Sequence, residues 1–354
     1  MSDKKFTVYT ITLSAAILLC MGIFIYIWDP CNYYRIEDNQ LKYVASAYID
    51  AGIIRNAEYD TAIIGSSMSQ NFDMQLFRDK LSINPVKINT GGITLEQRDL
   101  FYNAIEHTNK TDNYYIEIAL TKFNEDTDLL DDTPVYMYDD NQWNDLKYLY
   151  GYETWMRSLP ISLVYAGLDT LGIEIETAHN LENVDYVGEW YYRSKTGSDI
   201  VKKKYLSGID AVSAQDTDGM CERMMRNVDD KLTTVIDEDN SYVFYFPPYS
   251  ALFWHDAKEK GYVDAYYTVK EHILEVLLEY PNVRVFDFQY APFICDLDNY
   301  RDTTHYSKDI SDFMVNCFGN QEYMVTKENY KDGLKELKGH VEQFSDDNMG
   351  WLSK

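Results

Sequence analysis

The hydrophobic and polar positions divide the chain into one unbroken apolar segment and a long series of short apolar runs separated by amphipathic stretches. Residues 6–28 carry no charged side chain. A helix of that length reaches about 34 Å, which is enough to cross the hydrocarbon core of a bilayer. Lys4 and Lys5 precede the segment and acidic residues follow it, so the positive-inside rule predicts a cytoplasmic N-terminus and an extracytoplasmic remainder.

The apolar segment has two interpretations, a cleaved signal peptide or an uncleaved anchor. Bulky residues fill its end, where a cleavage site needs small ones, so we expect a single-pass membrane anchor. The expected parts of the chain are a cytoplasmic tail (1–5), the anchor (6–28), a stalk (29–55), a folded domain (56–320) and a C-terminal extension (321–354). Within the domain, residues 125–240 are too many for a simple crossover, and we expect them to form an insertion that caps the site.

Short runs rich in β-branched and aromatic residues predict strands, and the amphipathic segments between most of them predict helices. The strands are expected at 61–65, 86–89, 114–120, 242–246 and 283–288. The helices are expected at 68–81, 95–107, 263–279 and 308–317. This alternation predicts an α/β fold with a doubly wound parallel sheet, whose ligand site lies at the carboxyl ends of the strands.

Composition limits the classes of function. The chain is 45% hydrophobic, as globular proteins are, and its formal net charge of -26 argues against binding to nucleic acid. Cys20 lies in the predicted anchor, and the other cysteines either form two disulfides or remain buried thiols; they are Cys31, Cys221, Cys295 and Cys317. Because none has a second cysteine or a histidine at ligand spacing, we expect no metal site and no cofactor.

Candidate chemistry follows the strand ends. The first strand ends at Gly65-Ser66-Ser67, which presents a hydroxyl at a strand-to-helix turn with a helix N-terminus expected behind it. The second ends near Gly91-Gly92, where a glycine amide can approach a developing oxyanion. Far downstream, Asp302 precedes His305 by three residues, a spacing that lets the carboxylate orient the imidazole as a base for a serine.

These residues resemble the SGNH (GDSL-like) hydrolases, and in particular the membrane-anchored branch that includes alginate O-acetyltransferases and the D-alanine transfer protein of the teichoic-acid system. The resemblance covers roughly residues 56–320 and implies a three-layer, flavodoxin-like parallel sheet. It implies a catalytic triad of Ser67, Asp302 and His305, with an oxyanion hole formed by the amides of Ser67 and Gly92 (or Gly91).

Two positions depart from the pattern of the family. Ser66 stands where the hydrolases carry Asp, and the third strand does not end in the usual Gly-x-Asn. Asn124 is the candidate substitute for that side-chain oxyanion donor. The flanking serine, Ser69, is expected to take part in capping or local backbone hydrogen bonds.

The expected function is that of a membrane-anchored serine O-acyltransferase or acyl esterase acting on cell-envelope or exported glycans, with a multi-spanning membrane acyltransferase as a partner. The alternative is an inactive glycan-binding or assembly protein on the same scaffold. In the insertion, Trp143, Trp155 and Trp190 either stack on sugar rings or pack in the core. The turn at 246–250, after the fourth strand, is expected to line the cleft of the same site. Beyond it, His255 either contacts substrate or is an exposed residue at a helix start, and we expect the second.

Overall fold

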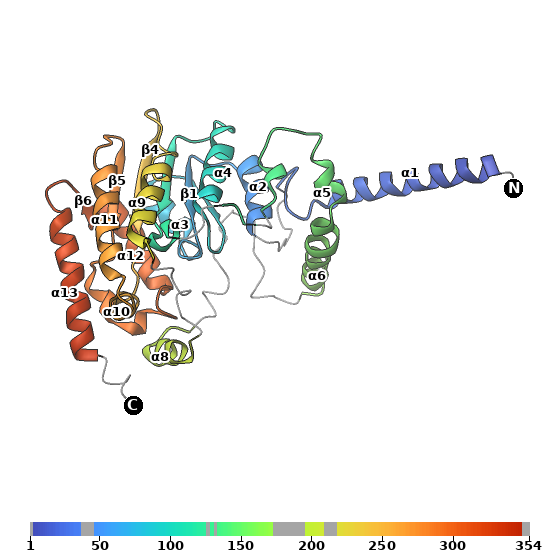
Figure 1. The fold of residues 1–354 in the computed structure, drawn as a ribbon. Helices are drawn as coiled ribbons and strands as arrows, with labels where there is room; N and C mark the ends of the chain where they lie inside the picture. Colours follow the sequence, from blue (N-terminus) through green and yellow to red (C-terminus); the bar gives the residue numbers. More distant parts are fainter. Residues whose placement is uncertain are drawn as a thin grey trace. The chain divides into compact units, whose positions relative to one another are not determined.

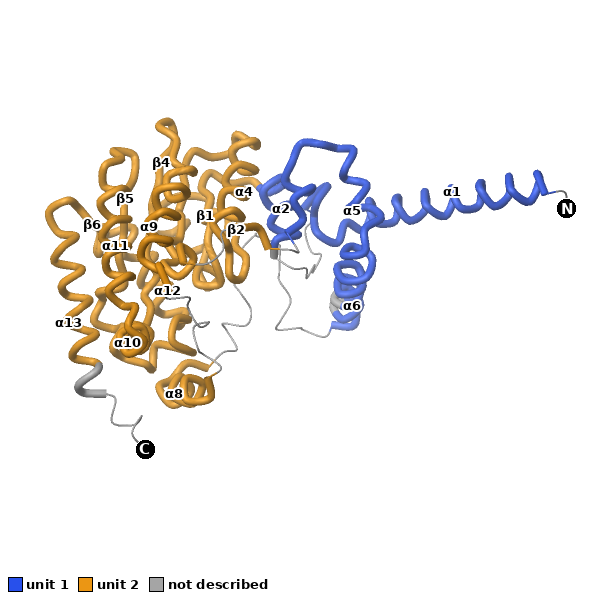
Figure 2. Tube along the Cα trace, in the orientation of Figure 1, with its two compact units in different colours: residues 1–57, 132–184 blue, residues 58–131, 185–354 orange. Residues whose placement is uncertain are grey.

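The computed structural model describes residues 3–36, 46–124, 128–130, 133–172, 195–208 and 218–348. The chain divides into two compact units, one made of residues 1–57 and 132–184 and the other of residues 58–131 and 185–354 (Figure 2). The segment 125–240, expected as one insertion, is divided between the two units. All of the candidate catalytic residues belong to the second unit.

The first unit begins with α1 (Asp3–Trp28), whose apolar side chains are largely exposed. By length and composition α1 can cross a membrane, a test that a signal sequence or a core helix also passes. After it, the buried Asp29 carboxylate accepts hydrogen bonds from the Tyr33 amide and the Tyr148 hydroxyl, each at 2.8 Å, which compensate its loss of water. The other helices described in this unit are α2 (Ser46–Asn56), α5 (Leu146–Tyr150), the π-helical η3 (Thr154–Ser158) and α6 (Leu159–Thr170), with a 3₁₀ turn η2 (Val135–Met137).

The second unit is built on a six-stranded sheet in the order β2-β1-β3-β4-β5-β6. Figure 1 labels β1, β4, β5 and β6 of this sheet. Its strands are β1 (Thr61–Gly65), β2 (Pro85–Asn89), β3 (Asn113–Glu117), β4 (Ser241–Phe246), β5 (Val283–Asp287) and β6 (Met324–Val325). The first five strands are parallel, which confirms the predicted α/β class. Because β1 lies between β2 and β3, the direction of strand addition reverses there, and such a switch point opens a crevice at the carboxyl ends of the strands.

The sheet is mixed and not purely parallel as predicted, because β6 pairs antiparallel with the edge strand β5. Two residues are too few for an apolar period to reveal a strand in the sequence. The segment expected as an extension, 321–354, also contributes α13 (Tyr330–Asn348), which contacts α10 (Ala251–Glu259) and α11 (Val263–Leu277). This part of the chain therefore completes the second unit.

Helices cover both faces of the sheet because successive strand residues point to opposite sides. On one face, Tyr115 of β3 makes ring contacts with Phe77 of α3 (Met74–Leu81) and Phe318 of α12 (Lys308–Asn320). On the other face, Tyr114 of the same strand meets Tyr102 of α4 (Leu95–Glu106) and Tyr242 of β4. The remaining helices of this unit include α8 (Ser198–Ser207) and α9 (Met220–Lys231). These aromatic clusters fix the layers that position the strand ends.

Two predicted boundaries next to the candidate site are wrong. The helix expected from residue 68 begins only at Met74, where the Asp73 carboxylate caps it by accepting hydrogen bonds from the amides of Gln75 and Leu76. The third strand ends at Glu117 and not at residue 120, because the chain then turns into the 3₁₀ helix η1 (Leu120–Phe123). Both differences change the surroundings of the candidate site.

Candidate active site

The turn after β1, residues 66–72, presents Ser67 and is called the serine turn below. Its backbone folds into successive tight turns, with the Ser69 amide donating to Ser66 O at 3.2 Å and the Phe72 amide donating to Ser69 O at 3.1 Å. The expectation of a helix N-terminus directly behind Ser67 is therefore wrong, since α3 begins further along the chain at Met74.

Side chains from distant segments satisfy the carbonyl groups of the serine turn. Lys87 of β2 is buried, and its Nζ donates to Gln70 O and Phe72 O, each at 2.9 Å. The Tyr306 hydroxyl donates to Met68 O at 2.8 Å. Because buried backbone carbonyls need partners, these contacts hold the turn in one conformation.

A buried carboxylate lies beneath the serine turn. Glu117, at the end of β3, accepts hydrogen bonds from the Ser66 amide at 3.0 Å and from the Ser66 hydroxyl. Burial raises the pKa of Glu117, while its hydrogen bonds from Ser66 oppose that effect. A Cβ on Gly65 would lie 2.7 Å from Glu117 Oε2 and 2.5 Å from Ser69 Oγ, so this close approach requires glycine at the end of β1.

The loop that carries Asp302 and His305 is closed at its base by an antiparallel bridge between Tyr300 and Tyr306. Within it, Asp302 Oδ1 accepts hydrogen bonds from the amides of Thr304 at 3.1 Å and His305 at 2.7 Å. The carboxylate therefore organises its own loop. This local folding explains how a spacing of three residues brings the carboxylate back to the imidazole.

The structure brings the three predicted catalytic residues together. Ser67 Oγ lies 2.9 Å from His305 Nε2, and His305 Nδ1 lies 2.9 Å from both carboxylate oxygens of Asp302. A carboxylate only accepts, so we assign the proton to Nδ1, which leaves Nε2 free to accept from the serine hydroxyl. Burial alone would raise the pKa of Asp302, but the hydrogen bonds that its carboxylate accepts from His305 and Thr304 outweigh it and hold that pKa well below its usual range.

These residues border an open cleft of about 200 Å³ at the carboxyl end of the sheet. Ser67 and His305 line one part of it, and Gly92 lines another. Gly92 has a φ of 70°, a left-handed conformation that favours glycine. The other lining residues are Ser66, Met68, Ala119, Thr121, Lys122, Tyr249, Phe253 and Thr304.

Asn124 is not among the residues that line the cleft. It follows η1, and its Oδ1 accepts hydrogen bonds from the Arg223 guanidinium at 3.1 and 2.6 Å. The expectation that Asn124 lies with the oxyanion donors is therefore not supported. The cause is the early end of β3, since the extra turn of η1 brings Thr121 and Lys122 to the cleft instead.

The sequence analysis missed three residues of this site, namely Glu117, Lys122 and Phe253, whereas Tyr249 belongs to the turn after the fourth strand that was expected to line the cleft. A signal existed for Glu117, because parallel strands buried on both faces are nearly continuous apolar runs and a carboxylate within such a run is unusual. Tyr249 and Phe253 surround the start of α10, and their rings lie 4.6 Å apart. Only the path of the chain brings Phe253 to Ser67, so its position was not predictable.

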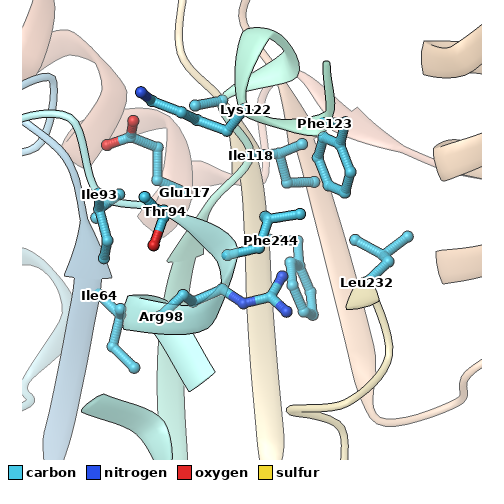
Figure 3. A pocket seen from close by; sticks show the side chains of 13 residues that line it. Ile64, Ile93, Thr94, Arg98, Glu117, Ile118, Lys122, Phe123, Leu232 and Phe244 are labelled. Atoms are coloured by element: carbon cyan, nitrogen blue, oxygen red, sulfur yellow. The ribbon is translucent and has the colours of Figure 1, made fainter. Parts of the chain in front are cut away.

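A second, smaller cavity lies next to the cleft and shares Ala119 and Lys122 with it. Figure 3 shows apolar side chains such as Ile118 along its walls, with Glu117 and Lys122 toward one end and Arg98 toward the other. The Arg98 guanidinium is held by Asp99 at 2.7 Å. The cavity thus separates the charged side chains of Glu117 and Lys122 from that of Arg98.

Several other predicted residues lie away from this site. His255 is buried on α10 and does not line the cleft, so the expectation of an exposed side chain is wrong; burial also lowers its pKa. Trp143 is exposed and Trp155 donates to Leu149 O at 2.7 Å, both within the first unit. Trp190 lies outside the described residues.

The five cysteines are all free thiols. Their spacing left two alternatives open, disulfides or thiols, and the structure has thiols. Cys317 is a buried residue of α12, and its burial raises the pKa of its thiol to about 12. Within the part of the chain that the structure describes, no group of three histidine, cysteine or acidic side chains is arranged to hold a metal ion.

Comparison of the chain with protein-family models, with curated proteins and with solved structures gave no match in any of the three. The assignment of chemistry to this site therefore rests on its residues and their geometry.

Proposed function

We propose that this protein is a serine-dependent acyl esterase or O-acyltransferase of the SGNH type. The observation that carries the proposal is the chain of hydrogen bonds from Ser67 through His305 to Asp302, with 2.9 Å at each step, beside an open cleft. Serine, histidine and aspartate in this order form the arrangement that activates a hydroxyl for attack on a carbonyl carbon.

The reaction proceeds in two halves. Ser67 Oγ attacks the ester carbonyl and its proton passes to His305 Nε2, while the carbonyl electron pair moves to oxygen. Collapse of this tetrahedral intermediate breaks the bond to the alcohol oxygen, which takes the proton from His305. Water or a second hydroxyl then attacks the acyl-serine by the same steps and releases a carboxylic acid or a new ester. Asp302 orients the imidazole and stabilises its positive charge throughout.

The setting of the activity is part of the proposal. We infer that α1 anchors the protein in the cell membrane with its N-terminus in the cytoplasm and the second unit outside, because lysines precede the helix and acidic residues follow it. The substrates are then acylated glycans of the cell envelope or exported polysaccharides. A multi-spanning membrane acyltransferase is the proposed partner, since tethering beside an exporter of acyl groups raises their effective concentration.

An inactive glycan-binding protein is the second candidate. It is favoured by one observation, that Asn124 is held by Arg223 and no side-chain amide is among the described residues that line the cleft. Loss of an oxyanion donor costs about 10²- to 10³-fold in rate, so it weakens an enzyme without abolishing its chemistry.

A serine-reactive fluorophosphonate probe separates the two candidates. We expect stoichiometric labelling of the detergent-solubilised full-length protein, no labelling of Ser67→Ala, and normal labelling of Ser69→Ala as the matched control. Absence of labelling and of acetyl-ester turnover in the wild type would instead support the binding protein. Protease treatment of intact cells tests the setting separately, because an extracytoplasmic second unit is degraded while cytoplasmic markers survive.

A further inference from the structure

Lys122 brings an ammonium group to the cleft that also holds Ser67 and His305. It lies on η1, directly after the third strand. Its Nζ is the atom nearest to the position that a Cβ on Gly92 would take, at a distance of 3.8 Å. The ammonium group and the backbone of Gly92 therefore border the same small space.

This space is where the proposed reaction needs hydrogen-bond donors. The carbonyl oxygen becomes negative in each tetrahedral intermediate, and donors that are already in place stabilise it more than mobile water does. Two backbone amides, those of Ser67 and Gly92, are expected there. In the part of the chain that the structure describes, no side-chain amide, the third donor of the resembling family, lines the cleft, and Asn124 is held by Arg223 instead.

We propose that Lys122 is the side-chain donor of the oxyanion hole, in which its ammonium group binds the carbonyl oxygen as negative charge develops. This inference rests on the proposed function. An ammonium group carries three donors and a full positive charge, so it stabilises an oxyanion more strongly than a neutral amide does in a site with little water. The departure from Gly-x-Asn then replaces the donor and does not remove it.

Glu117 supports this position of Lys122. Both side chains line the small cavity, and Figure 3 shows the Lys122 ammonium on the same side of it as the Glu117 carboxylate. Burial raises the pKa of Glu117, and the nearby positive charge of Lys122 acts against that effect. Electrostatic attraction to this carboxylate favours the position of the ammonium group near Gly92 when no substrate is bound.

This pairing also defines the competing explanation, that Lys122 serves only to balance the buried charge of Glu117. The two roles differ in what they affect. A charge-balancing lysine acts on stability, and its loss is compensated when Glu117 becomes neutral. An oxyanion donor acts on the transition state, and its loss lowers kcat whatever the charge of Glu117.

The test uses the detergent-solubilised full-length protein with p-nitrophenyl acetate as substrate. We expect Lys122→Met to lower kcat by about 10²- to 10³-fold with little change in KM. Binding of a trifluoromethyl ketone, which forms a tetrahedral oxyanion adduct with Ser67, should weaken by a similar factor. Lys122→Arg should retain part of the activity, and Lys258→Met, at an exposed lysine on α10, is the matched control.

The double variant Lys122→Met/Glu117→Gln decides between the two roles. The proposal expects it to be as slow as Lys122→Met alone. Recovery of wild-type kcat in the double variant, or wild-type kcat in Lys122→Met itself, would overturn the assignment while leaving the esterase intact. If Lys122→Met does not fold, Lys122→Gln and Lys122→Arg provide the same comparison. A wild type with neither turnover nor fluorophosphonate labelling would defeat the proposed function, and the role of Lys122 with it.

Discussion

The two walls of the cleft are built in different ways. On the wall that carries Ser67 and His305, buried hydrogen bonds hold each group, including those from Lys87 and Tyr306 to the serine turn. On the wall made by Gly92 and Lys122, a left-handed glycine and the end of a long side chain border the space. Hydrogen bonds fix the first wall. The second wall depends on the turns that the chain makes after β2, which place Gly92, and after β3, which place Lys122.

This difference has an energetic meaning. A nucleophile and its base must lie within hydrogen-bond reach, and an error of about 1 Å costs activity severely, so a rigid wall suits them. An ammonium group on a flexible stem tolerates small changes in the position of the oxyanion, because its attraction falls off slowly with distance. Substitutions on the first wall should therefore affect activity more than those on the second.

The largest expected effect is the loss of a triad residue. Under the proposed function, Ser67→Ala and His305→Ala should each lower kcat on p-nitrophenyl acetate by an amount on the order of a millionfold, the loss that follows removal of a triad residue from a serine protease. Circular dichroism should show both variants folded. If Ser66→Ala lost activity and Ser67→Ala kept it, the assignment of the nucleophile would be wrong.

The comparison is sharpened by substituting the two adjacent glycines. Gly92→Ala must adopt a φ of 70°, which costs a residue with a Cβ about 1–3 kcal/mol, and its Cβ would lie 3.8 Å from Lys122 Nζ. We expect a lower melting temperature and a lower kcat. Gly91→Ala is the matched control, because its added Cβ meets no atom within 4 Å. Equal loss of kcat in both variants would contradict the placement of the oxyanion hole at Gly92.

The buried carboxylate beneath the first wall predicts a dependence of stability on pH. The folded protein raises the pKa of Glu117 above its unfolded value of about 4.3, so its contribution to stability is present below that pH and is lost as the pH rises through the folded pKa. The melting temperature of Glu117→Gln should therefore rise relative to that of the wild type as the pH is raised from about 4, near the unfolded pKa, toward neutrality. Parallel curves over this range would refute the prediction.

The smallest effect is expected for Ser69→Ala. The Ser69 hydroxyl donates to Ser66 O at 2.9 Å inside the serine turn, and removing such a bond costs about 1 kcal/mol. We expect a small decrease in melting temperature and kcat within about threefold of wild type, since that cost falls mainly on the folded state. A loss comparable with that of Ser67→Ala would show that the serine turn is less rigid than its hydrogen bonds indicate.

The residues of the first wall were predictable because their signals are local. A serine directly after an apolar run, and an aspartate three residues before a histidine, are patterns within a few positions, and the structure joins them at 2.9 Å. The prediction for Asn124 failed because its contacts depend on a residue that is distant in the sequence. Its distance along the chain from the third strand was right for a donor, but η1 turned its side chain toward Arg223, 99 residues away in sequence.

By itself, the sequence determined the α/β class and the apolar N-terminal segment, and it predicted the three residues that the structure joins by hydrogen bonds, because periodicity and spacing depend on neighbours along the chain. The tertiary structure alone decided the order of the strands, the antiparallel edge strand β6 and the membership of the second wall. Those features depend on which distant segments pack together, as Glu117 does with Ser66 and Lys122 does with Gly92. A chain's local pattern limits such contacts but does not specify them, since each is chosen by the burial and hydrogen bonding of the whole fold.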